Sequence, residues 1–330
     1  MKEVFLDILA PILIMVALGA IIRRRFGLDL TTLNRLNIYL FVPAFIFDKV
    51  VSSHLPWQAM GGIFLLTVAH VALLGAVTLA AGLLVGAGRR TLAAVLLAVM
   101  FYNSGNIGLP LAELAFPAWR AAHTGRDGAA VQAFVLMAQN LLTFTLGLAV
   151  AVWGGATAGG QGLRMLFRMP MVPALAAALV VRWLTRGNPQ ELPAFLSATL
   201  RYLGSALVPV ALVTLGAQIA SNRRRPRWGP VSAVLVLRLL YAPVQMLALL
   251  WVLGRIMPRA GSPSPLSMFN LWPWPAQLMV LTAAVPTAVN TLLLTLELEG
   301  EADLAADAVF WTTICSGITL TGWLIFVRAW

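Results

Sequence analysis

The chain has few of the residues that build catalytic and metal sites. Its 330 residues include one cysteine and three histidines. A single cysteine, Cys315, excludes an internal disulfide and a thiolate metal cluster. His54, His70 and His123 are too scattered to indicate a metal site, and no Ser/His/Asp arrangement, phosphate-binding loop or dinucleotide fingerprint is present. The sequence therefore does not predict an enzyme, and no cofactor is expected.

Charged residues are also scarce. They make up 11% of the chain, hydrophobic residues make up 60%, and the mean hydropathy is +0.87, whereas soluble domains contain about 25% charged residues. The net charge of +11 could indicate nucleic-acid binding, but the arginines form small clusters between apolar segments instead of one basic face. We therefore predict an integral membrane protein that lies in a lipid bilayer and binds no nucleic acid.

Long apolar segments fill most of the chain. A helix needs about 20 apolar residues to cross the hydrocarbon core, and polar, Gly or Pro positions divide the sequence into ten such spans. They cover approximately residues 4–22, 33–51, 60–85, 91–116, 131–153, 169–184, 195–219, 231–253, 277–296 and 305–327. The predicted fold class is thus an all-α integral membrane protein with ten transmembrane helices.

Basic clusters predict the orientation of these spans. With ten spans both termini share a side, and the clusters at residues 23–25, 89–90, 164 and 168, and 223–227 fall on the opposite side. Lys and Arg are enriched on the cytoplasmic side, so both termini are predicted to lie outside. Glu3 and Asp7 near the start, and the lack of a small-residue cleavage site before the first arginines, favour a retained helix over a signal peptide.

Two polar stretches interrupt the fourth and the ninth spans. Their sequences are NSGNIGLP, which ends at Pro110, and VPTAVN, which contains Pro286. Broken helices are tolerated in lipid only where the freed backbone groups are buried in protein or line a cavity. Short or Gly/Pro-interrupted spans in corresponding positions of two halves point to a transporter's binding site. We therefore expect two broken helices that cross beside a substrate.

The two halves of the chain share a pattern. Pro43 and Pro209 stand in the middle of the second and seventh spans, 166 residues apart, and Pro110 and Pro286 are 176 residues apart. Residues 1–153 and 154–330 hold five spans each, so the second half enters the membrane in the opposite sense. This is the inverted 5+5 repeat of secondary transporters. The alternative is a chance match, because proline is common in membrane helices.

Nearly the whole chain resembles a known family. The string Asn103-x-x-Asn106-x-Gly108-Leu109-Pro110, the pair Pro286-x-x-x-Asn290, and residues 33–47 and 207–217 are similar to the auxin efflux carrier family, which includes bacterial permeases and plant PIN carriers. The resemblance implies the fold of bile acid sodium symporter-like proteins. Spans one, two, six and seven would form a scaffold domain and the other six a transport domain, with spans four and nine crossing at their prolines.

The resemblance also implies a function. Similar proteins carry organic anions, such as auxin or, in bacteria, small carboxylates, by an elevator-like movement of the transport domain, and they are often homodimers. This chain lacks the long cytoplasmic loop of the larger plant carriers and has only a short joint at residues 154–168. We therefore expect a homodimeric transporter of the bacterial inner membrane.

The predicted substrate site lies beside the two breaks. It consists of Asn103, Asn106, Gly108, Pro110, Pro286 and Asn290. Half-helix N-termini carry about half a positive charge and suit a carboxylate, although half-helix C-termini could equally hold a cation. The asparagines can bind substrate or cap the broken ends, and the prolines make the breaks. Gly108 permits either a close crossing or tight helix packing.

Four polar residues within the spans are further candidates. An ionisable residue in a span costs about 3 kcal/mol on insertion scales. Arg238 could supply positive charge for an anion, or it could pair structurally. Glu113, one helical turn after Pro110, could be a proton or sodium site, or a residue near the outer interface. Gln139 and Asn140, near the middle of the fifth span, could line the substrate site.

Other classes of membrane protein stay open at this point. A sodium-coupled organic-anion or bile-acid-like symporter would share the same breaks. An ion channel should show a continuous polar face, which most spans lack, and a sensor or assembly protein would need a soluble domain or sizeable loops. The sequence specifies neither the substrate, nor coupling to H⁺ or Na⁺, nor the direction of transport.

Overall fold

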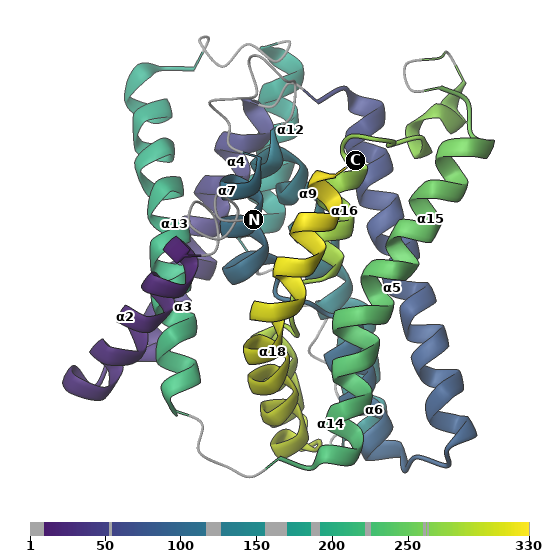
Figure 1. The fold of residues 1–330 in the computed structure, drawn as a ribbon. Coiled ribbons are helices and arrows are strands. Elements are labelled where there is room, and N and C mark those ends of the chain that lie inside the picture. Colours follow the sequence, from purple (N-terminus) through teal and green to yellow (C-terminus); the bar gives the residue numbers. More distant parts are fainter. Residues whose placement is uncertain are drawn as a thin grey trace. The chain divides into compact units, whose positions relative to one another are not determined.

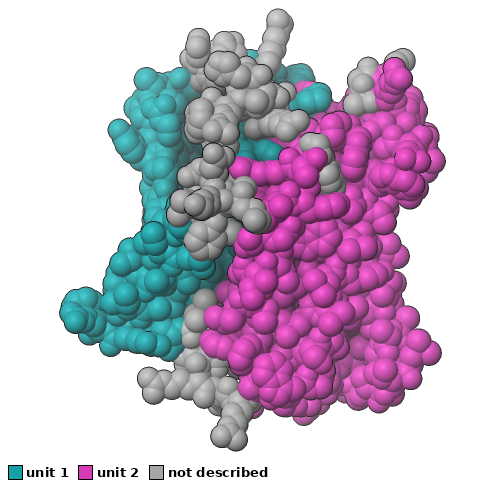
Figure 2. All heavy atoms as spheres, in the orientation of Figure 1, with its two compact units in different colours: residues 1–56, 105–137, 165–223 teal, residues 57–104, 138–164, 224–330 magenta. Residues whose placement is uncertain are grey.

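The computed structural model describes residues 10–52, 55–116, 127–155, 170–185, 192–221, 226–259, 262 and 264–329. These residues are nearly all helical, and their only β-type pairing is one isolated bridge between Tyr102 and Thr287. Contacts divide the chain into two compact units, coloured in Figure 2. Unit 1 comprises residues 1–56, 105–137 and 165–223, and unit 2 comprises residues 57–104, 138–164 and 224–330.

Five helical segments in the described residues are long and apolar enough to cross a membrane. They are Trp57–Leu84, Gly128–Gly154, Ala194–Ala217, Trp228–Ile256 and Ala302–Arg328. They coincide with the predicted third, fifth, seventh, eighth and tenth spans, which confirms a helical membrane protein. The count of ten and the inverted repeat stay predictions. The start of the first span (residues 4–9) and the basic residues 164, 168 and 223–225 lie outside the described residues.

Apolar side chains stay exposed along these helices, as expected for surfaces that contact lipid. On the last helix Ile318 is 82% exposed and Ile314 is 47% exposed, and Leu84, at the end of another helix, is 89% exposed. On a soluble protein, contiguous exposed apolar surface of this kind marks a site that binds a membrane or another protein. The chain therefore has outward faces suited to hydrocarbon.

Unit 1 is built around a close contact between its first and last helices. A Cβ atom on Gly216 would meet the carbonyl oxygen of Val16, and one on Gly19 would meet the carbonyl oxygen of Val213. Without a hydrophobic drive between helices in lipid, small residues allow this close packing. The unit contains α2 (Ala10–Phe26), α3 (Leu30–Leu36), η2 (Asn37–Phe41), α4 (Val42–Val51), most of η3 (Ser104–Gly108), α7 (Leu109–Ala115), most of α9 (Gly128–Leu142), α12 (Met171–Leu184) and α13 (Ala194–Ser221).

Unit 2 gathers the starts of three helices at one end. The Thr91 hydroxyl donates to Glu301 Oε1 at 2.7 Å, and Arg227 Nη1 lies 2.6 Å from Glu301 Oε2, so the starts of α6, α14 and α18 meet, as can be followed in Figure 1. The unit contains α5 (Trp57–Leu84), α6 (Arg89–Met100), η4 (Thr143–Gly147), α10 (Leu148–Gly154), α14 (Trp228–Val236), η6 (Leu237–Tyr241), α15 (Ala242–Ile256), η7 (Pro265–Phe269), α16 (Ala276–Ala283), α17 (Val289–Glu297) and α18 (Ala302–Arg328).

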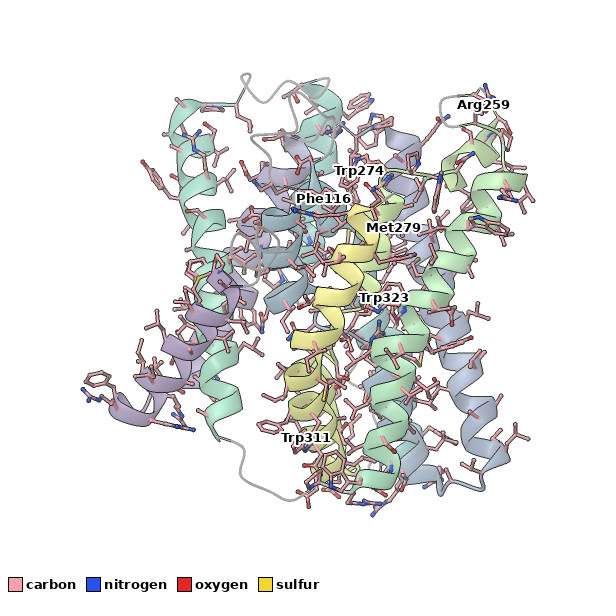
Figure 3. All side chains as sticks on the ribbon, in the orientation of Figure 1. Phe116, Arg259, Trp274, Met279, Trp311 and Trp323 are labelled. Carbon is pink, nitrogen blue, oxygen red and sulfur yellow. The ribbon has the colours of Figure 1, made fainter. Side chains whose placement is uncertain are left out.

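Several helices contain a π-helical turn. In the described chain these turns are η2, η3, η4 and η6. Such turns are rare in proteins as a whole, and those that occur are often found at functional sites. In η6 the turn holds Arg238, and the carbonyl of its neighbour Leu239 accepts a hydrogen bond from Trp323 Nε1 of α18 at 3.2 Å (Figure 3). The π turn is thus fixed against another helix of the same unit.

Candidate functional site

Two interrupted helices meet within unit 2. Helix α6 ends where Phe101 takes an extended conformation (φ −109°, ψ 117°). Helix α16 ends at residue 283 and α17 begins at residue 289, so the chain between them is also non-helical. We call residues 101–103 and 284–288 the crossing. It lies in the interior, since every one of its residues is buried.

The two segments of the crossing are hydrogen bonded to each other. The backbone N–H of Asn103 donates to the carbonyl of Pro286 at 2.8 Å, and the N–H of Ala288 donates to the carbonyl of Phe101 at 2.9 Å. Backbone groups without partners cost several kcal/mol each in lipid. The pairing therefore satisfies groups that the interrupted helices cannot satisfy internally.

Threonines satisfy further backbone groups at the crossing. The Thr287 hydroxyl donates to the carbonyl of Ala98, near the end of α6, at 2.8 Å. The N–H of Thr287 donates to the hydroxyl oxygen of Thr312 at 3.1 Å, and Thr312 in turn donates to the carbonyl of Ala308 at 2.6 Å. Helix α18 thus supports the crossing from one side, and the polar groups of the break are enclosed in protein.

Arg238 caps the ends of both interrupted helices. It is fully buried, and its guanidinium donates to the carbonyl of Val99 at 2.8 Å and to the carbonyl of Ala283. These carbonyls stand at the C-terminal ends of α6 and α16, where the helix dipole is negative. The guanidinium carbon also lies 4.8 Å from the centre of the Tyr102 ring. Arg238 thus has a structural role as a cap of two helix ends, and its role toward an anion stays a prediction.

The positive charge of Arg238 has no acidic partner among the described residues; its contacts are carbonyl groups and an aromatic face. Ionised groups inside a membrane protein usually pair with an opposite charge or line a polar pathway. Carbonyl dipoles and a ring face stabilise the cation but do not neutralise it. Arg238 therefore places one formal positive charge beside the crossing, in the protein interior, with no carboxylate next to it in the described part of the chain.

A histidine and a glutamine form a second buried polar pair in unit 2. Gln245 Nε2 lies 3.0 Å from His70 Nδ1 and 3.1 Å from the His70 carbonyl oxygen. A carbonyl oxygen only accepts, so the amide nitrogen faces it and donates to both atoms, and the proton of the neutral ring is assigned to Nε2. His70 Nε2 and Gln245 Oε1 are buried without a hydrogen-bond partner among the described residues. Sequence analysis missed this pair, although both residues are polar positions within apolar spans.

Six of the predicted site residues belong to unit 2. Asn103 is 6% exposed within the crossing, and Asn290 is half-buried in the first turn of α17. Gln139 lies beside the hydroxyl of Tyr102. The six residues are Asn103, Gln139, Asn140, Arg238, Pro286 and Asn290. Backbone bonding joins Asn103 to Pro286, and Arg238 reaches both helix ends of the crossing.

The other four predicted residues belong to unit 1. Asn106 and Gly108 lie in η3, and Pro110 lies in the first turn of α7. The prediction that Pro110 makes the break is wrong, because the chain leaves the helix at Phe101. Asn103, which lies seven residues before Pro110, is already hydrogen bonded to the second segment. Pro110 instead lies inside the continuous helical run that η3 and α7 form together.

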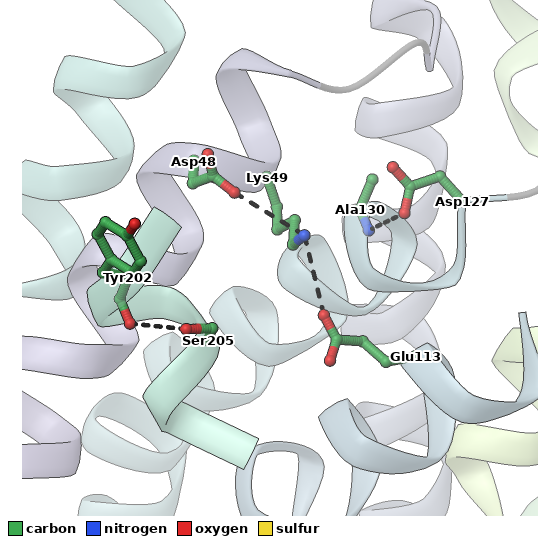
Figure 4. A network of polar contacts seen from close by, with 7 residues as sticks. All are labelled: Asp48, Lys49, Glu113, Asp127, Ala130, Tyr202 and Ser205. Carbon is green, nitrogen blue, oxygen red and sulfur yellow. Dashed lines mark hydrogen bonds and ion pairs between the residues drawn. The ribbon is translucent and has the colours of Figure 1, made fainter. Parts of the chain in front are cut away.

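Glu113, the fourth of these, takes part in a cluster of charges (Figure 4). Lys49 Nζ lies 3.8 Å from Glu113 Oε1 and 3.8 Å from Asp48 Oδ2, and the three side chains are only 21–36% exposed. Two carboxylates thus share one ammonium group. Among the described residues, no group of three or more His, Cys, Asp or Glu residues could hold a metal ion.

Comparison with known proteins adds to this geometry. A family model described as "Membrane transport protein" matches residues 5–324. An "Uncharacterized transporter" of Methanothermobacter thermautotrophicus is 27% identical over 331 residues, covering 95% of each chain. A "Putative malonate transporter" of Rhizobium meliloti is 25% identical over 307 residues, covering 90% of this chain and 87% of the relative. An "Uncharacterized transporter" of Methanocaldococcus jannaschii is 23% identical and covers 71% of this chain and 68% of the relative.

Proposed function

The chain belongs to the membrane transport protein family, and on this premise we propose that it is a secondary transporter of small organic anions. Members of such a family are integral membrane transporters of small molecules and not enzymes. The observation that carries the proposal is Arg238, which is fully buried and has no acidic partner in the described part of the chain. An anionic substrate would supply the missing negative charge.

The substrate class we propose is a small carboxylate, auxin-like or malate- or malonate-like. One relative bears the name "Putative malonate transporter". Asn103 and Asn290 would offer amide donors to the carboxylate, and the first turn of α17, which contains Asn290, has the dipole that favours an anion. Pro286 lies in the same crossing as Asn103, and Asn106, Gly108 and Pro110 stay predictions from the sequence. Gln139 and Asn140 would line it.

We propose an elevator-type movement as the mechanism. Spans one, two, six and seven would form the scaffold, and spans three, four, five, eight, nine and ten the transport domain of an inverted ten-helix repeat. The crossing, Arg238 and the His70–Gln245 pair all belong to one compact unit, which supports movement of these residues as one body. The protein would be a homodimer of the bacterial inner membrane with both termini outside.

Transport assays in proteoliposomes test the proposed substrate. We expect saturable uptake of labelled malonate or of another mono- or dicarboxylate. Asn103→Ala and Asn290→Ala should abolish uptake while the thermal unfolding midpoint stays close to that of the wild type. Arg255→Gln is the control, because Arg255 is exposed and stacks on Trp251 with 4.0 Å between the guanidinium carbon and the ring centre. Normal flux in both asparagine variants would refute the site, and uptake of only cations or neutral sugars would refute the anion class.

The same preparation separates the alternatives. A channel would give a conductance that does not saturate with substrate, whereas a carrier saturates. Imposed sodium and pH gradients distinguish a sodium-coupled symporter from a proton-coupled carrier and from uncoupled facilitation. Glu113→Gln belongs in this series: loss of a gradient effect with preserved uptake would assign the coupling ion to Glu113. An unchanged gradient effect would leave Glu113 with its ion pair to Lys49.

A further inference from the structure

An apolar groove lies away from the candidate site, at the end of unit 2 where α6 and α14 begin. Its volume is about 320 Å³, within the range of roughly 300–1,000 Å³ that is typical of ligand pockets. It is lined by the last turns of α5, the first turns of α6 and the start of α14. Its walls include Ala81, Val85, Leu92, Val95, Pro230 and Ala233.

The two threonines that line the groove do not donate hydrogen bonds into it. The Thr78 hydroxyl donates to the carbonyl of Leu74 at 2.7 Å, and the Thr91 hydroxyl donates to Glu301 Oε1 at 2.7 Å. Their methyl groups and the surrounding aliphatic side chains make the lining apolar. A ligand of this groove therefore gains free energy by burying hydrocarbon, in proportion to the area removed from water.

Two arginines begin α6 beside residues that line the groove. Arg89 and Arg90 lie in the sequence between Ala87 and Thr91, both of which line the groove. Both arginines are exposed, and in the described part of the chain neither has an acidic partner. The nearby Arg227 differs, because it is paired with Glu301. Two positive charges are thus available beside an apolar groove.

Aromatic residues place this end of unit 2 at the level of the lipid headgroups. Trp228 begins α14, is 55% exposed and packs against Trp311, which is labelled in Figure 3, with ring centres 4.8 Å apart. Tryptophan is enriched at membrane interfaces. Val85, at the turn after α5, is 80% exposed. Hydrocarbon would reach the groove from one side and charged headgroups from the other.

We propose that the groove holds one acyl chain of an anionic phospholipid and that the phosphate of this lipid contacts Arg89 and Arg90. Clusters of Lys and Arg beside membrane helices attract anionic lipid headgroups. The groove adds an apolar surface that an acyl chain fills and that a free phosphate would not contact. A zwitterionic lipid would fill the groove but would gain less from the two charges. The bound lipid would join α5, α6 and α14 at this end of unit 2.

Native mass spectrometry of the purified protein, titrated separately with phosphatidylglycerol and phosphatidylcholine of identical chains, tests the proposal. We expect tighter binding of phosphatidylglycerol. The double variant Arg89→Gln/Arg90→Gln should weaken that binding about 30-fold, at about fivefold per charge. The matched control is Arg24→Gln/Arg25→Gln, which removes two exposed arginines from the end of α2. It should leave the affinity unchanged.

A second pair of variants tests the groove itself. Ala81→Phe fills the groove, whereas Ala80→Phe changes an exposed neighbour on the same helix that does not line it. Ala81→Phe should abolish binding of both lipids, and Ala80→Phe should not. If Ala81→Phe fails to fold, Ala233→Phe fills the groove from α14. Equal affinity for the two lipids in the wild type would overturn the role of the arginines. Binding of glycerol phosphate as tight as that of the lipid, or unchanged lipid binding in the filled variants, would overturn the groove.

Discussion

Arg238 joins helix ends that are far apart in the sequence. Its carbonyl partners are 139 and 45 residues away along the chain. A guanidinium presents several N–H donors in a fixed plane, whereas an ammonium is a single compact charge on a flexible stem. One arginine can therefore donate to Val99 and Ala283 at the same time, and a lysine at this position would reach one of them well.

Arg238→Lys should destabilise the protein although it keeps the charge. Leaving one buried carbonyl without a donor costs about 1–3 kcal/mol, so the free energy of unfolding should fall by about that amount. Chemical unfolding in detergent micelles measures it. Arg255→Lys is the control, because Arg255 is exposed and packs on Trp251. Equal stability of the two variants would show that the second carbonyl contact contributes nothing.

Thr287→Val should also lower stability, because it removes the hydroxyl that donates to the carbonyl of Ala98. The side chain keeps its shape, so the expected loss of about 1–3 kcal/mol reports the unsatisfied carbonyl. Thr287→Ser should restore most of the loss. Thr321→Val provides the comparison, since the Thr321 hydroxyl donates to Gly317 on an exposed helix face. A similar shift in the unfolding midpoint for both valine variants would contradict the assignment.

Among the helices and their breaks, the sequence predicts the apolar elements better than the exact positions of the breaks. Pro286 has no N–H and marks the second break correctly. The first break falls at Phe101–Asn103, where the sequence has no Gly or Pro. Pairing with the distant segment at residues 284–288 accompanies this break, and local helix propensity does not predict such a pairing. The Gly and Pro residues downstream drew the prediction toward Pro110 for this reason.

The buried polar pairs show the same limit. Arg238 is visible in the sequence as a charge inside a span, but its carbonyl partners are not, because any helix end can offer them. His70 and Gln245 are 175 residues apart, and only the fold brings an amide beside an imidazole. Sequence reasoning can find such residues as polar positions in apolar spans, and it cannot find their partners.

The contact between α2 and α13 leads to a prediction for a whole element. Gly216→Ala should destabilise unit 1, because the new Cβ would meet the backbone carbonyl of Val16, which cannot rotate away as a side chain can. Overpacking of this kind costs about 1–3 kcal/mol. Gly317→Ala is the control, since nothing lies within 4 Å of a Cβ at that position. The thermal unfolding midpoints of the two variants give the comparison, and equal midpoints would refute the close contact.

At the scale of the whole molecule, the ends of unit 2 test the predicted orientation. The turn between α5 and α6 is followed by Arg89 and Arg90. The end of α15 leads to the loop that contains η7, and η7 packs against the first turns of α5. In a Cys315→Ser background, Val85→Cys should react with a membrane-impermeant maleimide only from the cytoplasm. Leu266→Cys should react only from outside. Both positions are exposed, at 80% and 52%. The reverse labelling pattern would place both termini inside.

The hydrogen bonds of the crossing also limit how this protein can change shape. Two backbone bonds join residues 101–103 to residues 284–288, Thr287 bonds to α6, and Arg238 joins the ends of α6 and α16. Separating the two segments would break these contacts together. The two segments of the crossing are therefore expected to move together as a rigid unit, and the crossing does not act as a hinge. Two spin labels, one on α6 and one on α16, should report a single narrow distance distribution with and without substrate.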